Sequence, residues 1–194
     1  MPLDGGTILV DDADISKLHP DQVRSRFITL PQEPVLIGGT VRHNMLLYEP
    51  NCTEDEMIAA LDAFGLWDTI DSKGGLDAAL TDDELLSHGQ RQLFCFARST
   101  LQKGNIVILD EPSSQSDRAT GKMMERAIRD TFTGHTVLCV AHKLSTILGF
   151  DTVIVMDAGS AVESGNPRAL LQDETSLFCT LMKSQREQVR DEQD

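Results

Sequence analysis

The segment NIVILDEP at residues 105–112 constrains the fold of this chain more than any other segment. Its four consecutive aliphatic residues, bounded by Gly104 and Pro112, are typical of a short strand covered on both faces, as in a parallel α/β sheet. Two carboxylates, Asp110 and Glu111, follow that strand directly. Open α/β sheets bind ligands at the carboxyl ends of their strands, although an acidic pair is also common in a solvated turn. Further motifs in the chain are needed to distinguish a ligand-binding site from a solvated loop.

Helix and strand patterns alternate through the second half of the chain. The stretch SHGQRQLFCFARSTLQ predicts a helix that leads into the strand, and its apolar face consists of Leu93, Phe94, Ala97 and Leu101. After Pro112 the pattern predicts a helix, a buried strand, a short helix, a strand hairpin and a helix that begins at Pro167. They occupy residues 118–132, 136–141, 143–148, 152–164 and 167–173. Such alternation predicts a parallel sheet with helical cover.

The first half of the chain has a different pattern. Residues 7–10 and 25–30 read as strands separated by a short polar segment. A helix is predicted after Thr53, because Glu56 completes a capping box with it and Gly65 supplies a stop signal. The expected fold is therefore α/β, with a small amino-terminal β part and a helical subdomain beside the parallel sheet.

Composition excludes several classes of protein. With 194 residues, 40% of them hydrophobic, and a formal charge of −14, the chain suits a globular domain with no nucleic-acid partner. No apolar run reaches the roughly 20 residues of a membrane-spanning helix, and the amino terminus has no export-signal pattern. The cysteines form no C-x-x-C pair, so reduced thiols are expected at Cys52, Cys95, Cys139 and Cys179.

Several ordered motifs resemble the nucleotide-binding domain of ATP-binding cassette (ABC) transporters. They are LLSHGQRQLFCFAR, NIVILDEPSSQSD and VLCVAHKLST, preceded by ITLPQEPVLIGGTVRHNM and GGTILVDDADISKL. The resemblance implies a P-loop NTPase-like sheet, incomplete here, with a partial nucleotide-binding domain at residues 1–182 and a charged tail at residues 183–194. The second domain of C-subfamily (multidrug-resistance-associated) full transporters is the most similar, because the first domain often lacks a glutamate at the position of Glu111.

The resemblance assigns LSHGQ to the signature segment of the family, which contacts the γ-phosphate of ATP on a partner domain. The amino end of a helix favours an anion, and Ser87 adds a hydroxyl donor while Gly89 permits close approach. His88 stands where glycine is usual, and Gln90 completes the segment. Without the neighbouring motifs, the same residues would be a helix cap followed by a turn.

Five further residues receive roles through the resemblance. Asp110 corresponds to the Walker B aspartate that holds Mg²⁺, and Glu111 to the catalytic glutamate. Gln32 corresponds to the Q-loop glutamine that reaches Mg²⁺ or water, and His142 to the histidine that contacts the γ-phosphate. Asp117 ends the D-loop at the dimer interface. Taken singly, a histidine at a strand end or a glutamine before Glu-Pro is more often structural.

The phosphate-cradling loop G-x-x-x-x-G-K-[ST] does not occur in this sequence. In the family it precedes the segment that begins at Gly5 by a few tens of residues. The Gly121–Lys122 pair lies in a predicted helix and is followed by Met123, so it is a chance dipeptide. We therefore expect weak or absent ATP binding, and deficient hydrolysis, by the chain alone.

The resemblance implies a cassette domain of a membrane exporter that couples ATP binding and hydrolysis to transport. ATP and Mg²⁺ are the implied cofactors, and a second nucleotide-binding domain and transmembrane domains are the implied partners. The domain would lie at the cytosolic face of a membrane, while the chain alone would be soluble and cytoplasmic. The alternative is a nonhydrolytic module, or a fragment, that presents its signature helix to a partner cassette.

Overall fold

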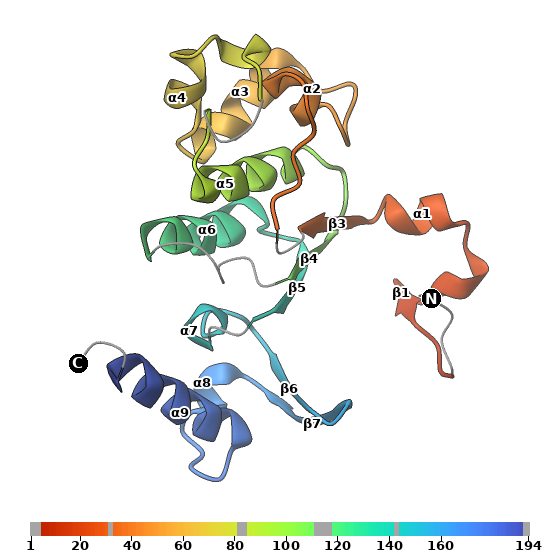
Figure 1. Ribbon diagram of the computed structural model, residues 1–194. Coiled ribbons are helices and arrows are strands. Elements are labelled where there is room, and N and C mark those ends of the chain that lie inside the picture. The colour runs from red at the N-terminus through yellow and green to blue at the C-terminus, as the bar shows by residue number, and fades with distance from the viewer. Residues whose placement is uncertain (1–4, 31–32, 81–84, 111–117, 142–143, 192–194) are drawn as a thin grey trace. The chain divides into compact units, whose positions relative to one another are not determined.

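The computed structural model describes residues 5–30, 33–80, 85–110, 118–141 and 144–191 (Figure 1). The chain divides into two compact units, Met1–Val140 and Ala141–Asp194. Each unit has its own buried apolar cluster.

A three-stranded parallel sheet forms the centre of the first unit. It consists of β3 (Phe27–Leu30), β4 (Ile106–Asp110) and β5 (Thr136–Val140), in that order across the sheet. Leu30 pairs with Leu109, and Leu109 pairs with Cys139, so the three strands reach the same edge. The predicted parallel sheet is confirmed.

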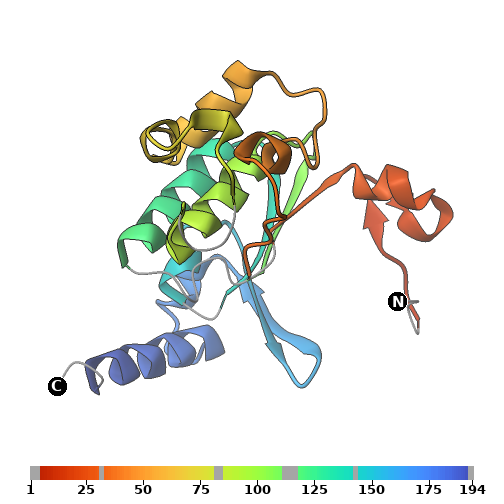
Figure 2. The same ribbon diagram turned by 45° about the horizontal axis from the view of Figure 1, so that its top comes forward.

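One face of this sheet is buried under helices. Ile28 of β3 and Val107 and Leu109 of β4 are at most 1% exposed. They belong to the same apolar cluster as residues of α5 (His88–Ser99) and α6 (Arg118–Thr131), and these two helices pack against each other (Figure 2). The sheet and the two helices thus build the expected α/β layer.

On the opposite face of the sheet, the described side chains are exposed or half-buried, which differs from the expectation from sequence. Leu138 and Val140 of β5 are 56% and 53% exposed, Thr29 of β3 is exposed, and Ile108 of β4 is only half-buried. The predictions of a β5 strand that is buried and of a β4 strand covered on both faces are therefore wrong. The helices of this unit that belong to the same apolar cluster as the sheet pack against the sheet face that carries Val107. An aliphatic run alone does not reveal how many of its faces are covered.

Two predicted helices are confirmed, and so is the capping box predicted for one of them. In α5 the residues Leu93, Phe94 and Ala97 are buried, while Leu101 lies beyond the end of the helix and packs against the core. The second helix, α3 (Glu54–Ala63), begins with the expected capping box, in which the Thr53 N–H donates to Glu56 at 2.8 Å. After this helix the backbone turns at Gly65, whose φ is +64°.

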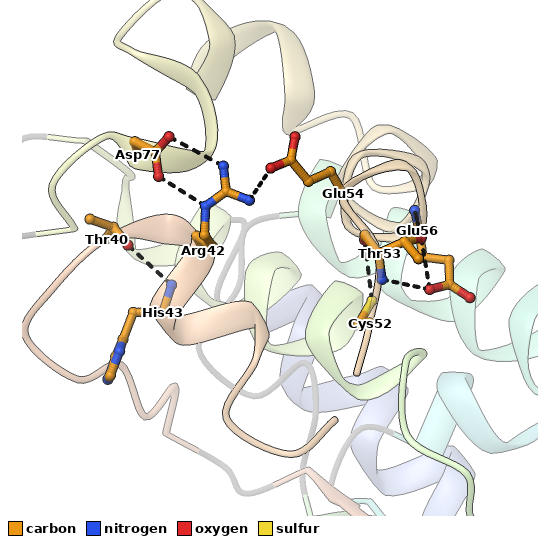
Figure 3. A network of polar contacts seen from close by, with 8 residues as sticks. All are labelled: Thr40, Arg42, His43, Cys52, Thr53, Glu54, Glu56 and Asp77. Atoms are coloured by element: carbon orange, nitrogen blue, oxygen red, sulfur yellow. Dashed lines mark hydrogen bonds and ion pairs between the residues drawn. The ribbon is translucent and has the colours of Figure 1, made fainter. Parts of the chain in front are cut away.

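Short elements complete the helical layer around α3. They are α2 (Val41–Met45), α4 (Trp67–Asp71) and the 3₁₀ helix η2 (Gly75–Asp77). The sequence pattern does not predict them, because five or fewer residues give no clear periodicity. The Arg42 guanidinium connects α2 with η2 and with α3, since it donates to Asp77 at 2.9 and 3.2 Å and also to Glu54 (Figure 3). These bonds raise the pKa of Arg42, and those to Asp77 lower the pKa of that carboxyl.

The amino-terminal part of the first unit is small. It contains an antiparallel pair, β1 (Leu9–Val10) and β2 (Ala13–Asp14), followed by the 3₁₀ helix η1 (Ile15–Lys17) and helix α1 (Pro20–Arg24). The predicted strands are confirmed, but the polar segment between them includes a helix. Pro20 occupies its first turn, where a missing N–H costs nothing.

The second unit combines a β-hairpin with helices. Its elements are α7 (Leu144–Ile147), β6 (Val153–Asp157), β7 (Ser160–Gly165), α8 (Pro167–Leu170) and α9 (Leu177–Asp191). The hairpin turns at Ala158 and Gly159, both with positive φ, as a type I′ turn requires. Glu163 of β7 accepts hydrogen bonds from Ser176 Oγ at 3.1 Å and Phe178 N at 2.8 Å, and so caps α9. Helix α9 continues past residue 183 into the charged tail.

Within the described ranges, no helix is long and apolar enough to cross a membrane.

Candidate functional site

The carboxyl ends of three adjacent parallel strands define the first candidate site. Asp110 is the last residue of β4, it pairs with Val140 of β5, and its side chain is exposed. The strands alternate their side chains between the two faces, so Asp110 lies on the same side as Ile108, away from the helical cover. An exposed carboxylate therefore lies at the sheet edge where this class of sheet binds ligands.

Three predicted catalytic residues follow these strand ends in the sequence. Gln32 comes two residues after β3, Glu111 directly after β4, and His142 two residues after β5. All three lie outside the described residues, as does Asp117, so their assigned roles stay predictions. The structure places the strand ends that precede Gln32, Glu111 and His142 side by side.

The Cys139 thiol of β5 has a raised pKa, and the charge of Asp110 contributes to it. Burial, together with the negative charge of Asp110, raises the pKa of the Cys139 thiol to about 11. The thiol therefore stays protonated at neutral pH, and a protonated thiol is a poor nucleophile and a poor metal ligand. The Cys139 side chain also lies on the opposite face of the sheet from Asp110, together with Leu109.

Among the described residues, Asp110 belongs to no group of three or more His, Cys, Asp or Glu side chains that could hold a metal ion. A single carboxylate nevertheless suits Mg²⁺, which keeps several waters and is often held by one or two carboxylates together with substrate phosphates. The described part of the site fits a phosphate-bound Mg²⁺ better than a structural metal.

The amino end of α5 forms the second candidate site. Ser87 is its N-cap, and its Oγ accepts a hydrogen bond from the Gln90 N–H at 3.3 Å, while Gln90 Oε1 accepts one from the Ser87 N–H at 2.9 Å. The side chain of Gln90 thus turns back onto the helix. Ser87 acts in the cap as an acceptor, so its O–H can still donate to a ligand.

His88 and Gly89 occupy the first turn of α5. Amides in this turn have no acceptor within the helix, and the helix dipole favours an anion nearby. Ser87 and His88 are exposed, and Gly89 is half-buried. Of the four predicted signature residues, Ser87, His88 and Gly89 lie at the amino end of α5 and Gln90 completes its cap, while their contact with an anion stays a prediction.

Two buried polar residues of α5 escaped the sequence analysis. Gln92 and Arg98 are 5% and 4% exposed, although both belong to types that are usually solvated. Arg98 Nη2 donates to the carbonyl of Val35 at 2.9 Å. The available signal was an arginine directly within the apolar run FCFARS, where a solvated side chain is unexpected.

Comparison with known proteins identifies the family. Residues 1–114 match the family model described as ABC transporter. The chain belongs to the ABC transporter family, as its motifs predicted.

The relatives refine this assignment. The chain is 45% identical to ABC multidrug transporter B of Aspergillus fumigatus over 184 residues, which cover 94% of this chain and 12% of the relative. It is 44% identical to ABC transporter ecdL of Aspergillus rugulosus, over 92% of this chain and 12% of the relative. It is also 37% identical to ATP-binding cassette sub-family C member 8 of Cricetus cricetus, over 92% of this chain and 11% of the relative. The predicted likeness to C-subfamily members is confirmed, and the chain spans about one eighth of the length of these relatives.

Proposed function

We propose that this chain is part of the ATP-binding cassette domain of a membrane exporter, in which ATP binding and hydrolysis drive transport. One observation carries the proposal: an exposed carboxylate, Asp110, ends the central strand of a parallel sheet in a chain of the ABC transporter family. The relative at 45% identity is named a multidrug transporter. ATP supplies a phosphoanhydride bond for hydrolysis, and Mg²⁺ neutralises the charge on its phosphates.

Asp110 would hold Mg²⁺ through water at the edge of the sheet. Glu111 would accept a proton from the attacking water or orient it, since it directly follows the strand that presents Asp110. Gln32 and His142 would contribute an amide and an imidazole from the ends of the neighbouring strands. Neighbouring parallel strands bring residues that are distant in sequence to one edge, which is why we assign these side chains to one site.

The amino end of α5 would serve a different nucleotide, held by a second cassette. The hydroxyl of Ser87 and the first-turn amides of His88 and Gly89 would donate to a terminal phosphate there. His88 is bulkier than the usual glycine, so it would limit close backbone approach while adding an imidazole donor. Asp117 would lie at the contact between the two cassettes.

We further propose the arrangement of the intact protein. Residues 1–182 would be the cassette part and residues 183–194 a charged extension, with transmembrane domains and a second nucleotide-binding domain as partners. The cassette would face the cytosol. The phosphate-cradling loop would come from a sequence that this chain does not contain, so the chain by itself would bind ATP weakly.

Hydrolysis by the intact protein tests the proposal. Glu111→Gln should lower kcat for ATP by a factor on the order of 100 or more, because a positioned general base contributes at least that much. Binding of ATP should persist, since the amide keeps the size of the side chain. Phosphate release and equilibrium nucleotide binding, measured on the same preparation, give the two quantities.

The matched control is Asp130→Asn, which removes an exposed carboxylate from α6 and should leave both quantities unchanged. The chain alone should hydrolyse no ATP. Hydrolysis at ordinary rates by the chain alone would contradict the proposal. Nucleotide-independent binding of the chain to a partner cassette, with no Glu111-dependent turnover in the intact protein, would favour the nonhydrolytic module instead.

A further inference from the structure

Arg91, the fourth residue of α5, contacts the chain that enters this helix. Its Nε donates a hydrogen bond to the Leu86 carbonyl at 3.2 Å, and its backbone N–H donates to the Ser87 carbonyl at 2.9 Å. Ser87 is the N-cap of α5, and Leu86 directly precedes it. Arg91 therefore binds the carbonyls of the two residues that lead into the first turn of the helix.

The contact between Arg91 and Leu86 occurs at a place where helices often have an apolar one. A residue just before the N-cap commonly packs against the fourth helical residue, which fixes the angle at which the chain enters the helix. Leu86 and Arg91 occupy these two positions, but the Leu86 side chain is buried in the apolar core and the link runs from guanidinium to carbonyl. A hydrogen bond from a charged donor is roughly twice as strong as a neutral one, and this one acts on the backbone itself.

The residue before Leu86 is also fixed by a basic side chain. Lys73, two residues beyond the end of α4, donates from Nζ to the Leu85 carbonyl at 3.2 Å. The side chains of Leu85 and Leu86 both belong to the main apolar cluster. Two hydrogen bonds and two buried leucines thus determine the course of the backbone into α5.

The helix end that this backbone carries remains accessible. The capping box fixes Ser87 and Gln90 relative to each other, while the side chains of Ser87 and His88 are exposed. The bond from Arg91 adds a constraint that the capping box lacks, because it ties the helix to the residue before the cap. Exposed groups on a fixed backbone lose little conformational freedom when a ligand binds them.

We propose that Arg91 is a positioning residue for the anion site at the amino end of α5. Through Leu86 it sets the direction of the Ser87 hydroxyl and of the first-turn amides. The inference rests on the proposed function, in which these donors contact the terminal phosphate of ATP held by a second cassette. Arg91 acts on that phosphate only through the backbone of Leu86 and Ser87.

Nucleotide binding by the intact protein tests this role. Arg91→Met keeps the apolar stem and removes the side-chain donors, and Glu111→Gln in the background should prevent turnover. The affinity for ATP should fall roughly tenfold, as expected for the loss of a hydrogen bond from a charged group. The affinity for ADP should change less than about twofold, because ADP lacks the terminal phosphate. Equilibrium binding of ATP and of ADP, each with Mg²⁺, gives the ratio of the two affinities.

Conservative and control variants separate positioning from stability. Arg91→Lys keeps a charged donor but loses the planar guanidinium, so its affinity for ATP should lie between those of the arginine and methionine proteins. This variant also keeps the inference testable should Arg91→Met fail to fold. Thr53→Ala removes the cap of α3, and it should lower stability without changing the ratio of affinities. Arg129→Met, at an exposed site on α6, should change neither quantity.

A double-mutant cycle shows whether Arg91 acts through the helix end. Ser87→Ala removes the hydroxyl donor and its part of the capping box. Arg91→Met should then lower the affinity for ATP by clearly less than its own tenfold effect, because both side chains serve the same helix end.

The outcomes also separate this inference from the proposed function. An unchanged affinity for ATP in Arg91→Met, or equal losses for ATP and ADP, would overturn the positioning role. Full additivity with Ser87→Ala, or the same change of the ratio in Thr53→Ala, would overturn it as well. In each of these cases Glu111-dependent hydrolysis would still support the cassette, whereas its absence in the intact protein would overturn both.

Discussion

At the scale of single residues, the spacing of polar side chains along strands and helices carries most of the functional information. Asp110 ends a strand and is exposed, whereas Cys139, on the neighbouring strand, is shielded and faces the helical cover with Leu109. The two residues differ by one register position and lie on opposite faces of the sheet. One position along the strand therefore separates a residue suited to a cation from one suited to the core.

The raised pKa of Cys139 predicts how stability changes at alkaline pH. The folded protein holds the thiol proton more tightly than the unfolded chain, because burial and Asp110 oppose ionisation, so this contribution is complete below the ordinary thiol pKa near 9. It is lost as the pH rises towards the folded value of about 11. Urea titrations across this range should show that Cys139→Ala loses less free energy of unfolding than the wild type. Equal losses of unfolding free energy in the wild type and in Cys139→Ala would contradict the prediction. Asp110→Asn should reduce the loss in a protein that keeps Cys139, because it removes the charge that opposes ionisation of the thiol.

At the scale of helices and strands, local hydrogen bonds set the boundaries. Both α3 and α5 begin with reciprocal capping boxes, between Thr53 and Glu56 and between Ser87 and Gln90. Such caps satisfy amides that the helix itself leaves without acceptors. In α5 the cap lies at the helix end where Ser87 and His88 are exposed.

Removal of the α3 cap should destabilise the first unit by a predictable amount. Thr53→Ala removes the hydroxyl that accepts from the Glu56 N–H at 3.3 Å, and it should cost about 1 kcal/mol of unfolding free energy, the usual value of an N-cap side chain. Thr53→Ser keeps the hydroxyl and should retain most of that stability. Chemical denaturation monitored at the single tryptophan, Trp67, measures both variants. Equal stabilities of the alanine and serine variants would show that the cap contributes nothing.

At the scale of the whole molecule, the unequal faces of the parallel sheet are the main result. The face that carries Leu109 belongs to the main apolar cluster, while the face that carries Leu138 is open in the described chain. Large exposed apolar side chains on one sheet face contribute little to the stability of the unit that bears them. Apolar packing therefore stabilises the described unit mainly through the sheet face that carries Leu109.

Two leucine truncations measure this asymmetry. Leu109→Ala should cost about 2–5 kcal/mol, because it opens a cavity at a fully buried position. Leu138→Ala, at a side chain that is 56% exposed, should cost less than about 1 kcal/mol in the same chain. Denaturant midpoints of the two variants give the comparison. A cost for Leu138→Ala that matched Leu109→Ala would mean that the outer face is covered.

The sequence by itself determined the longer local elements and their order, namely the helices α3 and α5, the aliphatic strand that ends in Asp110 and the hairpin, and its motifs predicted the family. The local elements depend on residues a few positions apart, and their hydrogen bonds are encoded directly by spacing. The roles of Gln32, Glu111, His142 and Asp117 remain predictions.

Only the tertiary structure decided which sheet face is covered, and which polar side chains leave the solvent. Arg98 reaches Val35 across 63 positions of sequence, and Arg42 reaches Asp77 across 35. No local pattern reports such contacts, because they depend on how elements pack and not on the period of any one element. Burial and long-range hydrogen bonds depend on which residues lie close together in space, and for residues far apart in the chain the tertiary fold determines this.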